Sequence, residues 1–319
     1  MSGDDEPVAR DDLERGVRRF QTLTAAEYDR LTPAGVIDIV NRRRIAETVR
    51  QPWARGGPEM AETIDLRVGE RAVGVRVHRP TGDRGLPALI YVHGGGWMLF
   101  SVNSHDRLMR EYAARAGVTV IGVDYSLAPE ARFPTPIDEL IEVVGWVRSP
   151  AGRDLLDPPS LAIGGDSAGA NLAVATNLAL RGAGKPMLDA MLLNYGAFDL
   201  ERRGSHGRFG GPEYTLTPDE MDEFWAAYLP DEHRQNPLAR PLLADLSGLP
   251  PAYLCVAECD ILADENAAMA QRLEAAGVAV TLNRYAGATH SFLEAVSVSS
   301  LADRALDDAS LWLSRVLRA

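Results

Sequence analysis

Length, composition and charge place this chain among large globular proteins. Its 319 residues, 46% of them hydrophobic and 24% charged, are enough to bury a large core. The formal net charge of −12 argues against a nucleic-acid-binding surface. The polar, acidic first ten residues predict no signal peptide, and no uncharged apolar stretch is long enough to span a membrane. We therefore expect a cytoplasmic protein that acts on a small molecule, and the sequence leaves open whether it forms a homodimer.

Cysteine usage gives no sign of a metal site. Only two cysteines occur, Cys255 and Cys259, and no cluster of histidines lies near them. Two thiols at this spacing do not make a zinc site, and reduced thiols are the usual state in the cytoplasm. We expect a protein without a metal or an organic cofactor.

Residues 1–58 differ in pattern from the rest and predict an N-terminal helical cap segment. Apolar residues at helical spacing predict helices over residues 11–31 and 33–49. The prolines and glycines of residues 51–58 predict a linker that ends the second helix.

Beyond residue 58 the pattern is typical of an α/β protein. Alternating residues predict an antiparallel hairpin of 63–68 and 71–78. Short apolar strands then alternate with helices, which predicts a mostly parallel central sheet flanked by helices. The expected strands are 88–92, 118–123, 161–164, 188–194, 253–257 and 278–284. The expected helices are 104–116, 136–147, 168–181, 263–276 and 301–317.

One interruption of this rhythm, residues 198–244, is too long for an ordinary loop. It contains a polar stretch, 202–207, that we expect to be flexible, followed by an amphipathic helix over 218–228. We expect it to form a cap insertion between two parts of the core, 59–197 and 245–319. Together with the N-terminal helices it would roof the carboxyl edge of the sheet.

A serine lies at the apex of a predicted turn between a strand and a helix. The turn reads Gly165-Asp166-Ser167-Ala168-Gly169, the G-x-S-x-G pattern of a nucleophile elbow. Glycines on both sides of the serine remove side chains that would collide with the neighbouring strand and helix. By itself the pentapeptide also fits an ordinary glycine-rich turn.

A second motif, His93-Gly94-Gly95-Gly96-Trp97, directly follows the strand 88–92. Successive glycines allow backbone N–H groups to approach a bound carbonyl closely. The motif predicts an oxyanion hole from Gly94, Gly95 and Gly96, completed by the N–H of Ala168. A phosphate-binding loop is disfavoured, because the spacing is not G-x-G-x-x-G and no Lys-Ser/Thr follows.

These segments, with Asp124-Tyr125-Ser126-Leu127-Ala128-Pro129-Glu130, resemble the hormone-sensitive-lipase-like branch of the α/β-hydrolase esterases. The resemblance continues through 248–251, 260–265 and 287–292, and so spans about residues 85–295 in one register. It implies the α/β-hydrolase fold with a helical cap.

The resemblance also implies a Ser-His-Asp triad. Asp260 and His290 match the family's acid and base, and each follows a predicted strand. The chain order Ser, Asp, His is the order expected for this fold. Asp264, Glu265 and Glu258 remain alternative acids.

The other histidines are expected to have no catalytic role. His93 is expected to anchor the glycine loop, whereas the remaining four are expected at the surface or in the cap. Those four are His78, His105, His206 and His233.

Trp97, Asp166 and Phe292 adjoin these motifs and are expected to line the substrate pocket, although Trp97 also fits a core position.

Two residues depart from the family pattern. Ser126 stands where an arginine is usual, and Ser291 stands where a glycine usually follows the catalytic histidine. Both put substrate choice and local geometry in question rather than the reaction.

The combined pattern predicts a serine hydrolase, a carboxylesterase that cleaves short-chain acyl esters through an acyl-enzyme intermediate. An amide or N-acetyl deacylase is the nearest alternative, because the same triad can expel an amine. A receptor, or a biosynthetic enzyme that reuses the pocket, is a further alternative, since a fold does not fix a function.

Overall fold

A computed structural model describes residues 13–35 and 37–318 of the chain. Within them the strands form one sheet, whose spatial order is β1-β2-β4-β3-β5-β6-β7-β8. Pairing is parallel from β4 through β8, whereas β2 runs antiparallel to both β1 and β4. The strands are β1 (Glu62–Val68), β2 (Val73–Arg79), β3 (Ala88–Val92), β4 (Thr119–Asp124), β5 (Leu161–Asp166), β6 (Ala190–Asn194), β7 (Ala252–Cys259) and β8 (Val280–Thr289).

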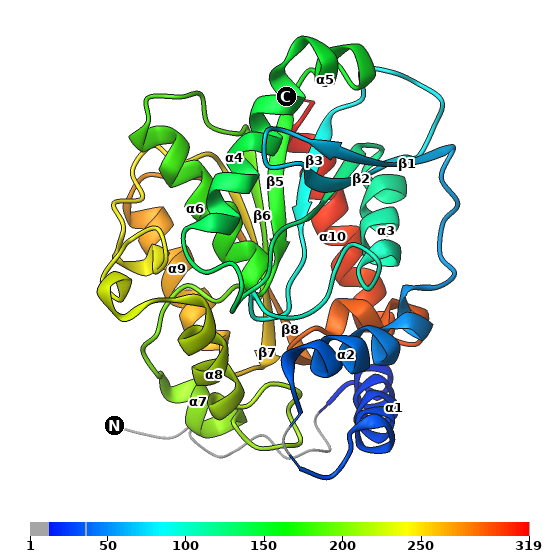
Figure 1. Ribbon diagram of the computed structural model, residues 1–319, viewed down its shortest axis with the longest axis vertical. Coiled ribbons are helices and arrows are strands. Elements are labelled where there is room, and N and C mark those ends of the chain that lie inside the picture. The colour runs from blue at the N-terminus through cyan, green and yellow to red at the C-terminus, as the bar shows by residue number, and fades with distance from the viewer. Residues whose placement is uncertain (1–12, 36, 319) are drawn as a thin grey trace.

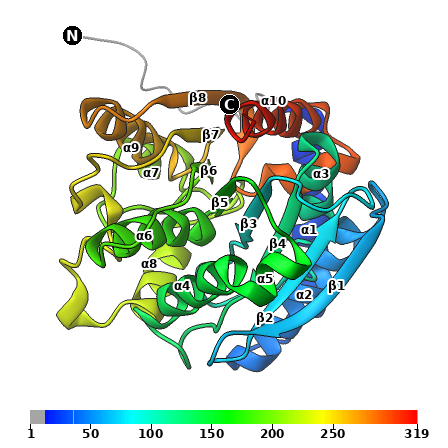
Figure 2. The same cartoon turned by 90° about the horizontal axis from the view of Figure 1, so that it is seen from above.

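Helices cover both faces of this sheet (Figure 2). One core cluster lies under α3 and α10, and a second lies under α4, α6 and α9. Every residue of β3, β5 and β6 is buried, as expected for central strands covered on both sides. The helices are α1 (Arg15–Leu31), α2 (Ile39–Ala54), α3 (Asp106–Ala116), α4 (Thr135–Arg148), α5 (Pro150–Leu155), α6 (Ala168–Gly182), α7 (Gly204–Phe209), α8 (Pro218–Tyr228), α9 (Ala263–Ala275) and α10 (Ser300–Val316). Short 3₁₀ segments are η2 (Asp231–His233), η3 (Pro241–Leu243) and η4 (Phe292–Ser297). None of the helices described is long and apolar enough to cross a membrane.

The helices α1, α2, α7 and α8 lie together at one end of the sheet (Figure 1). The side chain of Glu14 caps the start of α1 by accepting a hydrogen bond from the Val17 N–H, at 2.8 Å. The same carboxylate accepts the Ser299 hydroxyl, at 2.8 Å, just before α10. Because Val17 and Phe20 are fully buried in the cluster under α10, α1 is packed onto the body rather than loosely attached.

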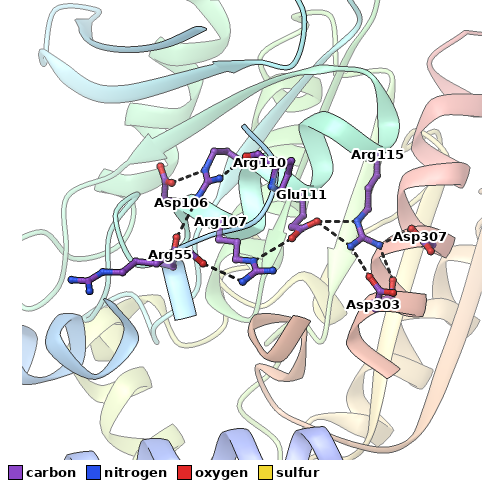
Figure 3. Close-up of polar contacts among 10 residues, drawn as sticks. Arg55, Asp106, Arg107, Arg110, Glu111, Arg115, Asp303 and Asp307 are labelled. Atoms are coloured by element: carbon purple, nitrogen blue, oxygen red, sulfur yellow. Dashed lines mark hydrogen bonds and ion pairs between the residues drawn. The ribbon is translucent and has the colours of Figure 1, made fainter. Parts of the chain in front are cut away.

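Arginines of α3 join distant parts of the chain (Figure 3). Arg115 binds Asp303 and Asp307 of α10, at 2.7 and 2.6 Å. Arg107 and Arg110 donate to the backbone carbonyls of Arg55 and Pro58, between α2 and β1. The segment that leaves the N-terminal helices is therefore fastened to the body.

The expected fold is confirmed: a mostly parallel sheet flanked by helices, with N-terminal helices forming a cap. The hairpin and the alternating strands and helices form where predicted, with small shifts at their ends. Residues 11, 12 and 36 of the predicted N-terminal helices lie outside the described residues.

The second N-terminal helix begins at Ile39 rather than at residue 33, and two further local predictions are wrong. The helix α2 continues through Pro52 to Ala54, where a linker was predicted, since Trp53 packs edge-on against Phe20 with ring centroids 4.8 Å apart. The stretch predicted to be flexible overlaps the first part of α7, because Asp264 accepts the Ser205 N–H at 2.8 Å and the Ser205 hydroxyl donates to the Ile261 carbonyl. In both cases a contact with a distant residue overrides the local pattern.

Candidate active site

Ser167 lies between the end of β5 and the start of α6. Its φ of +53° and ψ of −118° belong to a strained backbone region that few non-glycine residues adopt. A Cβ added at Gly165 or Gly169 would overlap the carbonyl oxygen of Val92 in the neighbouring strand. Glycine at both positions therefore allows β5, β3 and α6 to approach closely enough to hold Ser167 in this conformation.

His290 contacts both Ser167 and Asp260. Its Nε2 lies 3.0 Å from the Ser167 hydroxyl oxygen, and its Nδ1 lies 2.7 Å from an Asp260 carboxylate oxygen. Asp260 directly follows β7 and His290 directly follows β8, so the parallel sheet brings them to the edge where β5 delivers the serine. In the neutral tautomer that this geometry favours, Nδ1–H donates to Asp260 and Nε2 accepts the serine proton.

The electrostatics of His290 favour a protonated intermediate. Burial lowers the pKa of the imidazole, but the charge and the hydrogen bond of Asp260 outweigh burial, and the pKa lies above its ordinary value of 6.5. The site can therefore take up a proton from Ser167 and hold it beside a carboxylate.

The alternative acids are engaged elsewhere. Asp264 accepts the Ser205 N–H and binds Arg208 at 2.7 Å. Glu265 accepts the N–H groups of Phe198 and Asp199. Glu258 accepts the Gly287 N–H at 3.3 Å. Asp260 is thus the carboxylate that the structure brings to His290.

The glycine loop lies beside Ser167. Gly95 and Gly96 line the same cavity as the serine, and their φ values of +107° and +59° favour glycine. In the described part of the chain, nothing accepts a hydrogen bond from their N–H groups. The Gly94 N–H, by contrast, donates to Asp166 at 3.2 Å. The Gly94 N–H is thus engaged by Asp166 in this structure, whereas those of Gly95 and Gly96 are not.

Asp166 lies beneath the loop and does not line the cavity, contrary to expectation. It accepts the Tyr91 hydroxyl at 2.8 Å and lies 3.3 Å from Nε2 of His105. His105 was predicted at the surface or in the cap, yet it is buried, and so is His78 on strand β2 of the hairpin. Burial lowers the pKa of His105, but the charge of Asp166 outweighs it and raises the pKa above 6.5. The pattern of the sequence gave no sign of this pair, because its members lie 61 residues apart.

His93 is buried and close to its expected role. Its Nδ1 lies 2.8 Å from the Gly94 carbonyl oxygen, and its ring stacks on Tyr125 at 4.4 Å. Burial lowers the pKa of His93 to about 3, so the ring is neutral and anchors the loop.

A cavity of about 550 Å³ opens above Ser167 and His290. Its walls come from α1, α2 and the segment 212–224, besides the glycine loop and Ser291. Trp97 and Phe292 were expected in this wall but lie outside it. Trp97 is stacked on Tyr228 at 4.5 Å, and Phe292 packs among Tyr195 and Tyr285.

Several wall residues were not singled out from the sequence. They include Thr24, Tyr28, Arg50, Met221 and Phe224. Helical spacing marks such side chains as buried, but it does not tell a core position from a cavity wall.

Both departures from the family pattern have a clear place in the structure. Ser126 donates its N–H and its hydroxyl to Glu139, at 2.7 and 2.5 Å, so this buried carboxylate is satisfied without an arginine at position 126. Ser291 has a φ of +64°, a left-handed conformation in which glycine is least strained, and it lines the cavity beside His290.

Comparison with known proteins agrees with this geometry. The profile of a family described as alpha/beta hydrolase fold matches residues 89–294. The chain is 34% identical over 282 residues to an acetyl esterase of Salmonella choleraesuis (strain SC-B67), covering 86% of each. The chain therefore belongs to the α/β hydrolase fold family, within its hormone-sensitive-lipase-like branch.

Solved structures of esterases superpose on most of the chain. An ester hydrolase from the metagenome of Lake Arreo, complexed with a bipyridine phosphonate derivative, shares 34% identity with a TM-score of 0.89, covering 96% of this chain and 100% of that one. The Pyrobaculum calidifontis esterase shares 31% identity with a TM-score of 0.85, over 96% of this chain and 100% of its own. EstE1, a thermophilic carboxylesterase from a metagenomic library, shares 32% identity with a TM-score of 0.85, over 89% and 99%.

Proposed function

We propose that this protein, a carboxylic ester hydrolase, cleaves acetyl and other short-chain acyl esters with Ser167 as its nucleophile. The observation that carries the proposal is the pair of contacts of His290, 3.0 Å to Ser167 and 2.7 Å to Asp260, at the floor of a cavity. The acetyl esterase and carboxylesterase relatives support an ester as the substrate.

The reaction proceeds in two halves. The Ser167 hydroxyl oxygen attacks the ester carbonyl carbon while Nε2 of His290 accepts the hydroxyl proton. Asp260 holds the Nδ1–H and stabilises the imidazolium. The tetrahedral intermediate then breaks its bond to the alcohol, which leaves with the proton from His290. Water repeats the sequence on the acyl-serine, releasing the carboxylic acid and restoring Ser167.

The oxyanion of each tetrahedral intermediate needs backbone donors. We assign this role to the N–H groups of Gly95, Gly96 and Ala168, since Gly94 is committed to Asp166. Ala168 begins α6, so its N–H lies at the positive end of that helix. Asp166 accepts the Gly94 N–H and directly precedes Ser167. It therefore links the glycine loop to the start of α6, the two segments that supply the donors.

Two segments complete the site as a cap. We assign residues 1–58 and 198–244 to the cap and residues 59–197 and 245–319 to the core. The described parts of both cap segments contribute side chains to the cavity wall, which supports this division.

Cys255 and Cys259 form no disulfide, which fits a reducing compartment such as the cytoplasm.

Covalent labelling tests the function directly. Brief exposure to a serine-directed phosphonate should add one adduct to the protein, located on the peptide that contains Ser167. Ser167→Ala should fold normally, take up no adduct and lose nearly all hydrolysis of 4-nitrophenyl acetate. Retention of more than about a tenth of the wild-type rate would remove Ser167 as nucleophile, since the loss of a triad serine normally costs far more. Faster turnover of a matched N-acetyl anilide than of the acetate ester would favour the deacylase alternative.

A further inference from the structure

Arg50 is a buried cation in the wall of the catalytic cavity. It lies near the end of α2, is only 5% exposed, and lines the cavity that contains Ser167 and His290. Its charge also acts on His290, where it opposes in part the rise in pKa that Asp260 causes. A charged side chain this deeply buried is rare unless something in its surroundings requires it.

Two aromatic rings hold the guanidinium group in place. Its central carbon lies 5.1 Å from the ring centroid of Phe20 and 5.2 Å from that of Phe100. Such contacts stabilise a cation and restrict its plane, but they accept no directed N–H hydrogen bond at the edge of the group. The two rings therefore orient the guanidinium group without occupying its N–H donors.

Among the described residues Arg50 forms an ion pair with Glu294, and this contact leaves two of its nitrogens without a hydrogen bond. The closest approach to Glu294 is 3.4 Å, from Nε to a carboxylate oxygen. Within the described residues, Nε and Nη1 of Arg50 and both oxygens of Glu294 have no hydrogen-bond partner. Glu294 is absent from the wall of the catalytic cavity and lines a separate small cavity with Trp53 and Ser104. Burial raises the pKa of the Glu294 carboxyl, and the nearby charge of Arg50 lowers it in part.

The other charged residues of the cavity wall differ from Arg50. Arg42, also on α2, is paired with Glu223. Glu220 accepts the Thr217 N–H and hydroxyl in the cap of α8. Asp29 and Glu213 are exposed at the rim. Arg50 is thus the buried cation whose donors the described residues do not satisfy.

We propose that Arg50 binds a carboxylate of the substrate, so that the preferred substrate is a short ester carrying an anionic carboxylate on its acyl or alcohol half. A carboxylate in the cavity matches the planar donors of a guanidinium group, which Arg50 presents as part of the cavity wall. This inference rests on the proposed esterase function, because the carboxylate is placed relative to an ester bound at Ser167.

Two pairs of matched substrates separate the effect of the substrate's charge from that of its shape. In one pair the carboxylate or amide is on the alcohol half of the ester, and in the other it is on the acyl half. The alcohol arm compares 4-acetoxybenzoate with 4-acetoxybenzamide, and the acyl arm compares ethyl hydrogen glutarate with ethyl glutaramate. Each pair differs only by a carboxylate or an isosteric amide away from the reacting ester. In at least one arm, the wild-type kcat/KM should favour the carboxylate by about tenfold to a hundredfold, the range expected for hydrogen bonds between charged groups. The arm that shows the preference identifies the half of the ester that faces Arg50.

Arg50→Met should abolish that preference, because it keeps the length of the side chain and removes its charge and donors. Arg50→Met with Glu294→Gln should do the same without leaving an unpaired buried carboxylate, and so remains informative if the single variant folds poorly. Arg42→Met is the matched control: it removes one positive charge from the same helix and cavity and should change the preference less than twofold. Benzoate should also inhibit the wild-type enzyme more strongly than benzamide.

The outcomes distinguish this inference from the proposed function. Hydrolysis of the neutral members with no preference for the carboxylate in either arm, and equal inhibition by benzoate and benzamide, would overturn the role of Arg50 and leave the esterase function intact. A preference that survives in both Arg50 variants would also overturn it. If the enzyme hydrolyses none of the four esters and does not hydrolyse 4-nitrophenyl acetate either, the proposed function is contradicted.

Discussion

At the residue scale, Asp260 and Asp264 allow a direct comparison, since both follow β7 but only Asp260 contacts His290. Asp260→Asn should lower kcat roughly 10⁴-fold, because the amide favours the wrong imidazole tautomer and does not stabilise the imidazolium. Asp264→Asn should keep most activity and lose about 1 kcal/mol of stability through its contacts with α7. Steady-state kinetics and urea unfolding of both variants measure these effects, and a reversal would make Asp264 the triad acid.

The pH dependence of the reaction also belongs to the residue scale. In the proposed mechanism His290 acts as a base only when it is neutral, and Asp260 holds its pKa above 6.5 despite burial. We therefore expect kcat/KM to rise with pH, with a midpoint above 6.5. The sign for stability is opposite: the contact of the imidazolium with Asp260 stabilises the fold fully below 6.5, and this contribution is lost as pH rises through the pKa of the folded state.

His105 is the control for that assignment, because its pKa is also raised. In Asp260→Asn the midpoint of the residual activity should fall, since the group that raises the pKa of His290 loses its charge. In His105→Gln the midpoint should move much less. A midpoint that follows His105 rather than Asp260 would show that the Asp166–His105 pair, not the triad, controls the profile.

At the scale of elements, the packing of α1 on the body can be tested with one methyl group. A Cβ at Gly16 would overlap the backbone of Val298 and Ser299, whereas a Cβ at Gly145 in α4 meets nothing within 4 Å. Gly16→Ala should therefore displace α1, cost about 1–3 kcal/mol and reduce esterase activity through the cavity wall. Gly145→Ala should stabilise the protein by about 0.5–1 kcal/mol, as expected for an open helical position.

Thermal or urea unfolding, together with kcat/KM for a short ester, separates the two variants. The same chemical change should act with opposite signs on stability, and only Gly16→Ala should affect catalysis. Equal behaviour of the two variants would mean that α1 does not pack against the start of α10 as described.

At the scale of the whole molecule, the roof should limit the length of the acyl chain. The cavity of about 550 Å³ is lined by α1, α2 and the segment 212–224, besides the glycine loop. Each methylene buried in it contributes only about 0.8 kcal/mol, which a steric clash readily cancels. We expect the highest kcat/KM on acyl chains of about two to six carbons and a steep decline beyond, because the clash then outweighs burial.

A series of 4-nitrophenyl esters from acetate to laurate measures that limit. The carboxylate-bearing substrates that we infer for Arg50 fall within the same size range. A preference of the intact enzyme for emulsified long-chain triglycerides would contradict the roof, since such substrates need an open apolar face.

Local chemistry let the sequence by itself determine the fold class and the site's main groups. Ser167 needs glycines two residues away on either side, and the glycine loop needs consecutive residues without side chains, so both signals lie within a few residues. The alternation of apolar strands and helices likewise predicts a parallel sheet, whose carboxyl edge gathers residues that follow strands. Asp260 and His290 each follow a predicted strand, and the resemblance to the hormone-sensitive-lipase-like esterases implies their roles as acid and base.

Only the tertiary structure decided which groups meet across long stretches of chain. In the structure Asp260, and not Asp264, contacts His290, and Asp166 is buried with His105. Trp97 and Phe292 lie outside the cavity wall where they were expected. The tertiary structure also brings Arg50 of the N-terminal helices to the cavity above Ser167. Helical spacing indicates that one face of a helix is buried, but it does not indicate what that face packs against. The packing partner depends on contacts between residues that are far apart in the sequence.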